Sequence, residues 1–180
     1  LLRGAGYRTE VFETESIVVR GDGNDLATLI DSAGDDVFRA EPHTAALEGF
    51  GFTNRVDAFG TVRAIASQGG TDAAYLVDSA GDDLFSAGPV VTVLRGQGFA
   101  NYTHQFERVY AQATSGYDRA HLHDSIGDDT FVATPEFATL SGDGFSNTAA
   151  NFDIANGHAT SGGIDRAELY GSSGNDRLFR

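Results

Sequence analysis

Short acidic clusters are the parts of this chain best suited to chemistry. The segment DSAGDD begins at Asp31 and again at Asp78, DSIGDD begins at Asp124, and GSSGND begins at Gly171. These starts are 47, 46 and 47 residues apart. Calcium takes six to eight oxygen ligands, which carboxylates and backbone carbonyls supply. Glycine in the same segments allows the positive φ that turns a carbonyl toward an ion. The clusters therefore predict calcium sites in repeated turns.

A weaker acidic turn of the form Gly-x-Asp precedes each cluster and offers a second set of ligands. Its aspartates are Asp25, Asp72, Asp118 and Asp165. If such turns stack at about 4.8 Å, each pair of carboxylates repels by about 0.9 kcal/mol in water, or about 3.5 kcal/mol at an effective dielectric of 20. A cation between them would remove this repulsion. The alternative is that Asp and Asn side chains only accept hydrogen bonds from turn amides, which needs no metal.

The residues between the turns predict β-strands. Apolar residues alternate with others in Ala-x-Leu pairs, which is the period of a strand with one buried face. The pairs are Ala27/Leu29, Ala45/Leu47, Ala74/Leu76, Ala120/Leu122, Ala138/Leu140 and Ala167/Leu169. Each unit also carries a Gly-x-Gly-Phe element, at Gly49, Gly96 and Gly142, and we expect it to open a longer excursion. Frequent glycine excludes a helical interpretation, because each would cost about 1 kcal/mol in a helix interior.

A 46- to 47-residue unit of this kind indicates an all-β protein, a parallel β-solenoid of the β-helix or β-roll type. We expect two stacked coils in each unit and about seven coils in total, with identical acidic bends lying over one another in one row. The chain then forms a single solenoid segment of a longer repeat protein. Its parts are a partial repeat 1–24, repeats 25–71, 72–117 and 118–164, and a partial repeat 165–180.

The acidic turns resemble the calcium-binding nonapeptide GGxGxDxUx of RTX proteins, in which U is a large apolar residue. Residues 171–179 match it with serine in place of the second glycine, and the three DSxGDDxFx segments keep the Gly, the Asp and the apolar residue. The resemblance implies that turns of neighbouring coils clasp calcium. The ligands it implies are Asp31, Asp35, Asp36, Asp78, Asp82, Asp83, Asp124, Asp128, Asp129, Asn175 and Asp176.

Composition and charge argue against several other classes of function. The formal net charge is −14, every basic residue is Arg, and there is no cysteine. Such a charge opposes binding to nucleic acid or insertion into an anionic membrane. Disulfides and thiolate metal sites are excluded. His121 and His123 flank Leu122 and should point outward, but other repeats have different residues there, which favours ordinary surface variation over a site.

These observations predict a calcium-stabilised structural or adhesive repeat module of a large secreted or cell-surface bacterial protein, and not an enzyme. Extracellular calcium is concentrated enough to fill weak sites, which indicates a location outside the cell. The expected partners are calcium ions, neighbouring repeats or further copies of the same protein in a filament, and surface glycans. The alternative hypothesis is a polysaccharide-active or carbohydrate-binding β-helix module.

Overall fold

A computed structural model describes residues 2–4, 7–10 and 14–178, and Phe179 of the nonapeptide lies outside the described residues. The described residues form 19 strands and no helix. One sheet has ten strands, in the spatial order β19 (Arg166–Leu169), β15 (Thr130–Ala133), β16 (Phe137–Gly142), β17 (Phe145–Ala150), β13 (Arg108–Gln112), β9 (Ala73–Val77), β5 (Val37–Glu41), β6 (Thr44–Gly49), β7 (Phe52–Asp57) and β3 (Ser16–Arg20). The second has seven, in the order β18 (Ile154–His158), β14 (Arg119–His123), β10 (Leu84–Ala87), β11 (Val91–Gly96), β12 (Phe99–His104), β8 (Thr61–Ile65) and β4 (Leu26–Ile30). A separate hairpin joins β1 (Leu2–Gly4) and β2 (Tyr7–Thr9).

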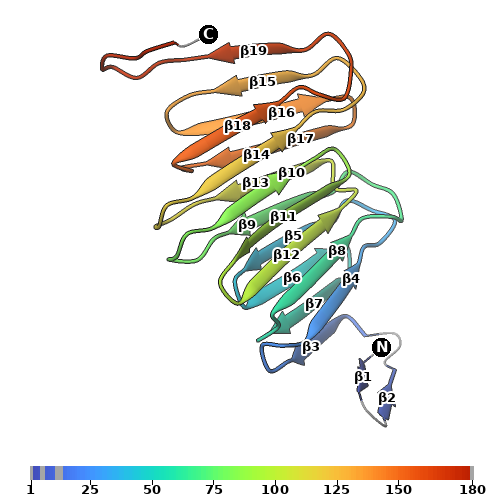
Figure 1. The fold of residues 1–180 in the computed structure, drawn as a ribbon. Helices are drawn as coiled ribbons and strands as arrows, with labels where there is room; N and C mark the ends of the chain where they lie inside the picture. The colour runs from blue at the N-terminus through green and yellow to red at the C-terminus, as the bar shows by residue number, and fades with distance from the viewer. Residues whose placement is uncertain (1, 5–6, 11–13, 179–180) are drawn as a thin grey trace.

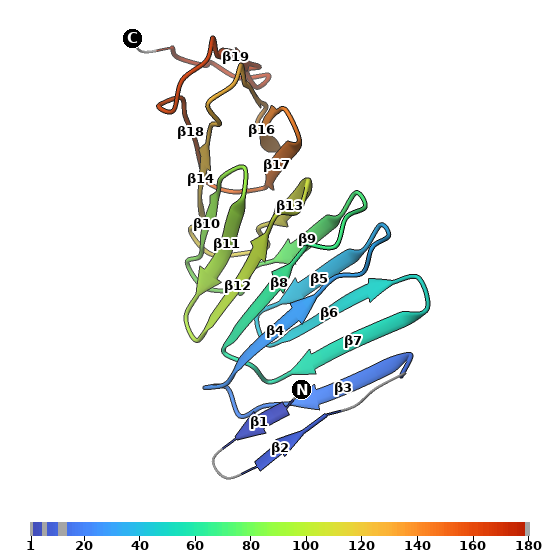
Figure 2. The same ribbon diagram turned by 90° about the vertical axis from the view of Figure 1, so that its right-hand side faces the viewer.

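The chain winds between these two sheets as a β-solenoid, which confirms the predicted fold class. Strands from successive turns pair in parallel, for example β4 with β8 and β5 with β9. Figure 1 shows the strands stacked from β3 at one end to β19 at the other, and Figure 2 shows the same stack from the side. We call the edge where the chain passes from the seven-stranded to the ten-stranded sheet edge one, and the opposite edge two.

The prediction of two coils in each unit and about seven coils in total is wrong. The Gly-x-Gly-Phe element closes an antiparallel hairpin, so β5, β6 and β7 form a meander within one sheet, as do β10–β12 and β15–β17. Each meander adds two strands without a crossing, so a unit crosses between the sheets three times. From β4 to β19 the chain crosses nine times, which is about four and a half turns at two crossings a turn.

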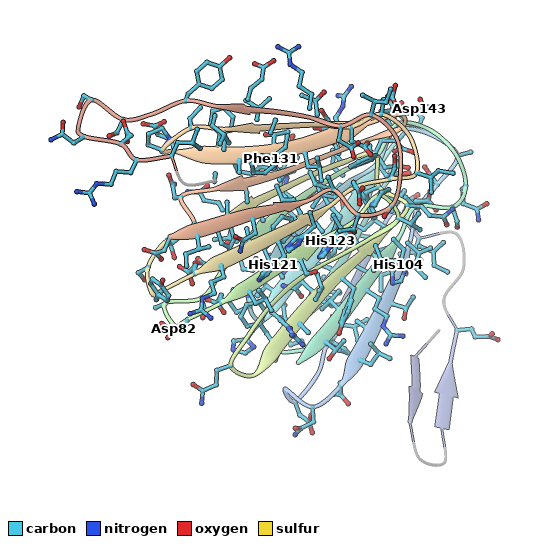
Figure 3. All side chains as sticks on the ribbon, turned by 45° about the horizontal axis from the view of Figure 1, so that its top comes forward. Asp82, His104, His121, His123, Phe131 and Asp143 are labelled. Atoms are coloured by element: carbon cyan, nitrogen blue, oxygen red, sulfur yellow. The ribbon has the colours of Figure 1, made fainter. Side chains whose placement is uncertain are left out.

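The single row of identical acidic bends is also wrong, and the odd number of crossings is the reason. After three crossings, the next unit starts on the opposite sheet. The DSxGDD turns at 31–36 and 124–129 therefore lie at edge one, whereas the turn at 78–83 lies at edge two. Figure 3 labels Asp82 and Asp143 on opposite sides of the stack, and Asp143 belongs to the hairpin that lies against the turn at 124–129.

The core lies between the sheets and contains the predicted inward residues. Phe38, Leu47, Leu76, Phe85, Leu94 and Leu122 are completely buried. The first five Ala-x-Leu pairs are buried as expected. Leu169 of the sixth pair is exposed, because β19 is the outermost strand of its sheet. The short second crossing of each unit, between the DSxGDD turn and the Gly-x-Asp turn, places Phe59, Phe106 or Phe152 against this core, directly after a residue with positive φ.

Candidate metal centres in the acidic turns

Each DSxGDD turn lies beside the Gly-x-Asp turn of the next coil rather than beside another DSxGDD turn. Parallel pairing of β4 with β8 and of β5 with β9 places residues 31–36 next to residues 66–72. The same arrangement recurs twice further along the chain. It produces three acidic triads, each with one oxygen per residue within 4.8 Å of the others: Asp31, Asp36 and Asp72; Asp78, Asp83 and Asp118; Asp124, Asp129 and Asp165.

The first triad is held by a network of backbone amides. Asp31 follows β4, and its Oδ2 accepts hydrogen bonds from the N–H groups of Ser67 and Gln68 at 2.8 and 2.9 Å. Asp36 turns back to accept from the N–H and Oγ of Ser32. The N–H of Asp36 donates to Asp72 Oδ1 at 2.8 Å. The three carboxylates are therefore fixed by the fold of two adjacent turns.

The second triad repeats this network at edge two. Asp78 accepts from the N–H and Oγ1 of Thr114, and the N–H of Asp83 donates to Asp118 Oδ1 at 2.8 Å. All three aspartates are buried, as they are in the first triad.

The third triad has the same layout but is more open. The N–H of Asp129 donates to Asp165 Oδ1 at 3.0 Å, and Asp124 Oδ2 accepts from the N–H of Ser161 at 2.7 Å. Asp165 itself is exposed. All three carboxylates line a cavity of about 160 Å³, which is large enough for a cation with water molecules.

Each triad contains one buried carboxylate oxygen that no hydrogen-bond donor reaches. These atoms are Asp31 Oδ1, Asp83 Oδ1 and Asp124 Oδ1, on side chains that are at least nine-tenths buried. The ion pairs of the described residues involve Asp57 and Glu168 and none of the nine clustered aspartates. Buried carboxylate oxygens are normally paired, because losing hydration without a partner is costly. Each of the three triads thus contains a buried carboxylate oxygen whose negative charge no hydrogen bond or ion pair offsets.

The raised pKa of one aspartate in each of the first two triads also indicates uncompensated negative charge. Burial raises the pKa of Asp72 from 3.8 to about 6, against the lowering effect of the Asp36 amide, and nearby carboxylates including Glu107 add to the rise. Burial likewise raises the pKa of Asp118 to about 6, with neighbouring carboxylates contributing. In the third triad the Ser161 amide holds the pKa of Asp124 below its usual value. In these two triads the charged carboxylates therefore carry a free-energy cost, which a proton would remove below about pH 6 and which a bound metal cation would remove at neutral pH.

The first glycine of each Gly-x-Gly-Phe element forms one wall of a triad. It lies 13 residues after the last aspartate of the cluster, in Gly49, Gly96 and Gly142. A Cβ at Gly49 would overlap Asp36 Oδ1 and the ring of Phe52, and the other two glycines are equally close to Asp83 and Asp129. The absence of a side chain here lets the hairpin cover the carboxylate with apolar groups, which keeps water away from it.

The structure brings together nine of the fifteen residues predicted as ligands and places six outside the triads. Asp35, Asp82 and Asp128 are exposed and accept hydrogen bonds from amides of the neighbouring turn. Asp25 is exposed and accepts from the Asp22 amide, and the next turn has Gly60 in place of an acid. Asn175 and Asp176 follow β19, with Asp176 bonded to Ser172. Five of these six side chains, all except Asn175, accept hydrogen bonds as in the alternative interpretation that needs no metal.

Two acidic residues near the triads were missed by the sequence interpretation. The N–H of Asp72 donates to Glu107 Oε2 at 2.7 Å, and the N–H of Asp118 donates to Asp153 Oδ2 at 2.8 Å. Both acids follow the phenylalanine of the short second crossing, at the position that Gly60 has in the first unit. Aligning the repeats on Phe59, Phe106 and Phe152 would have revealed the recurring acid at this position. Glu107 and Asp153 each add a carboxylate from a third turn to the first and second triads.

Comparison with known proteins identifies no relative: no protein-family model, no curated protein and no solved structure matches the chain. Among the residues that the structure describes, no helix is long and apolar enough to cross a membrane.

Proposed function

We propose that this chain is a calcium-stabilised structural or adhesive repeat module in which one ion binds to each acidic triad. The observation that carries this proposal is the recurrence, three times, of a buried carboxylate oxygen without a donor inside a cluster of three aspartates. One such atom could be a local accident. Its recurrence at both edges of the solenoid, on the first aspartate of the cluster in two triads and on the last aspartate in the other, supports a common ligand.

The donor set fits calcium better than a transition metal. Each triad offers carboxylate oxygens only, with no imidazole or thiolate, and hard oxygen ligands suit calcium. Bound calcium would supply two positive charges to three carboxylates. Aspartates from two successive turns would then be held together, so that ion binding becomes part of the folding free energy.

The proposed setting is the outside of a bacterial cell, within a larger secreted or surface-attached protein. Calcium is abundant there and scarce in the cytosol, which suits small sites with three carboxylates. β3 and β19 are the outer strands of the ten-stranded sheet, and outer strands can pair with a neighbouring repeat or another copy of the protein. End-to-end association into a filament belongs to the same proposal.

Calcium titration of the purified chain tests this function. We expect calcium to raise the melting temperature in circular dichroism and calorimetry, and EDTA to reverse the effect. Magnesium at the same concentration should have less effect, because it prefers a near-ideal octahedral site that keeps several water molecules. Melting curves that coincide in calcium and in EDTA would exclude the calcium role.

A carbohydrate-binding module is the second candidate, and the outer face of the ten-stranded sheet favours it. Tyr75 and Tyr110 are neighbours on β9 and β13, 42% and 38% exposed, and their ring centroids are 6.3 Å apart. The guanidinium of Arg39 lies 4.8 Å from the Tyr75 centroid. Three shallow grooves meet end to end at these two tyrosines and extend to Phe137. Exposed aromatic rings can stack on the apolar faces of sugar rings.

A glycan array probed with the calcium-loaded chain tests this second candidate. Binding that Tyr75→Ala and Tyr110→Ala both remove, and that Tyr102→Ala on the other sheet preserves, would support a glycan-binding face. An array without reproducible binding leaves the structural role as the better account.

A further inference from the structure

Three histidines meet on the outer face of the seven-stranded sheet and offer ring nitrogens as ligands, whereas the acidic triads offer only carboxylate oxygens. Parallel pairing of β14 with β18 places His123 directly opposite His158, and His121 two residues earlier. The rings of His123 and His158 stack with centroids 4.7 Å apart, and those of His121 and His158 meet edge to edge with centroids 5.3 Å apart. Figure 3 shows His121 and His123 close together on this sheet. His158 was not singled out from the sequence, because only the pairing of β14 with β18 brings it beside the other two histidines.

Two ring nitrogens of this group face each other. His121 Nδ1 and His158 Nε2 are 3.0 Å apart, and the centroid separation of 5.3 Å is about the largest that two imidazoles with such nitrogens can have. The lone pair of each nitrogen therefore points at the other nitrogen. A divalent transition metal binds an imidazole nitrogen at about 2.0–2.1 Å, so a small turn of both rings about their Cβ–Cγ bonds would direct the two nitrogens at one ion.

The neighbouring groups are compatible with a bound cation. Without a metal, the two nitrogens share one proton in a single hydrogen bond. A metal takes the place of that proton and uses both nitrogens as ligands. Ser86 and Asn156 lie directly opposite His121 on the two adjacent strands, and water or their oxygens can complete the coordination. The formal net charge of −14 raises the local concentration of any divalent cation.

We propose that His121 and His158 form a two-nitrogen site for a divalent transition metal, with Cu²⁺ bound in preference to Ni²⁺ and Zn²⁺. Copper is favoured by the general order of affinities of divalent metals for nitrogen ligands. The site uses ring nitrogens, whereas the triads offer only carboxylate oxygens, so one chain would sort two kinds of cation by ligand type even though His158 also lines the cavity of the third triad. It does not depend on calcium being the ion in the triads.

Copper titration with electron paramagnetic resonance tests the site in the folded, calcium-saturated chain. We expect one Cu²⁺ per chain with the signature of two imidazole nitrogens, unaffected by excess calcium. His121→Asn should remove that signature and weaken binding at least tenfold. His43→Asn, in the β5–β6 turn, should leave it unchanged. His123→Asn removes a stacking neighbour but neither ligand, so the two-nitrogen signature should persist.

Other outcomes would overturn the proposal. Copper with no nitrogen or only one nitrogen in its coordination would exclude the pair, as would a two-nitrogen signature that persists in His121→Asn. Displacement of copper by calcium would assign it to the acidic triads instead. Circular dichroism of each variant in calcium establishes that the fold is retained, and His158→Asn provides a second loss variant if His121→Asn does not fold.

Discussion

Replacing Asp72 with asparagine separates the two roles that an acidic triad can have. The new side chain keeps an oxygen that can accept the hydrogen bond from the Asp36 amide, which is 2.8 Å long in the natural sequence. It removes one negative charge from the first triad, which contains the unpaired Asp31 Oδ1. Without calcium the substitution should therefore stabilise the fold. With calcium it should remove a ligand.

The expected magnitudes follow from the raised pKa. A rise from 3.8 to about 6 corresponds to about 3 kcal/mol of unfavourable free energy for the charged form at neutral pH. A chain of this size gains about 2–4 °C in melting temperature per kcal/mol, so Asp72→Asn should melt up to roughly 6–12 °C higher in EDTA. Calcium at about 100 times its dissociation constant contributes about 2.7 kcal/mol per site. The variant should lose about that much of the calcium response.

Differential scanning calorimetry at about pH 7.5, with EDTA and with calcium, measures both effects. Asp35→Asn is the matched control, because Asp35 lies in the facing turn, is exposed, and accepts only the Thr71 amide. Its calcium response should equal that of the natural sequence. If Asp72→Asn melts lower than the natural sequence in EDTA, the triad is not under charge repulsion. If its calcium response is undiminished, the ion does not bind at the first triad.

Three further predictions concern pH, the glycine wall and the open third site. In EDTA, lowering the pH from about 7.5 to about 5 should raise the melting temperature, because Asp72 and Asp118 have folded pKa values of about 6, above 3.8, so that stability is gained below pH 6 and lost as the pH rises through 6. In calcium the same change of pH should lower the melting temperature, because protons displace the ion. A lower melting temperature at pH 5 in EDTA would contradict the raised pKa values. Gly49→Ala should lower the free energy of unfolding, measured by chemical denaturation, by about 1–3 kcal/mol, because its Cβ would overlap Asp36. Gly34→Ala, whose Cβ would make only an ordinary contact, should lower it far less. Equal losses would contradict the close packing of Gly49 against Asp36. Asp165→Asn should stabilise the calcium-free chain less than Asp118→Asn does in the same melting assay, because Asp165 is exposed and Asp118 is buried, and the reverse order would contradict that burial argument.

The sequence was sufficient for the fold class because period and alternation are local properties. Ala-x-Leu pairs and the 46- to 47-residue unit required a stack of strands, and the structure has one. The number of coils was wrong because the Gly-x-Gly-Phe element was interpreted as a wider coil. A hairpin and a wide coil use the same apolar alternation. In the structure the antiparallel pairing of β6 with β7, with positive φ at Gly51, identifies the hairpin, and the other units show the same. That one misassignment changed the count of crossings in every unit.

The composition of the candidate site could not be predicted for the same reason. Stacking identical turns would have grouped Asp31 with Asp78 and Asp124, whereas three crossings per unit place successive copies at opposite edges. The partner of each strong cluster is instead the weaker turn about 36 residues later, as the bond from Asp36 to Asp72 shows. Asp35 and its equivalents were expected to bind an ion because they lie within the segments that resemble the nonapeptide, and in the structure their side chains accept hydrogen bonds from turn amides at the surface.

The odd number of crossings also determines how ions would stabilise such a protein. Each triad is completed within about one unit, as residues 31–72 illustrate, so every unit carries its own site and does not rely on a distant one. Successive sites lie at alternate edges, so ions bound to neighbouring units would fasten the stack first on one side and then on the other. A stack held at one edge only could open at the other edge. With one site per unit, alternation therefore places bound ions at both edges of the stack.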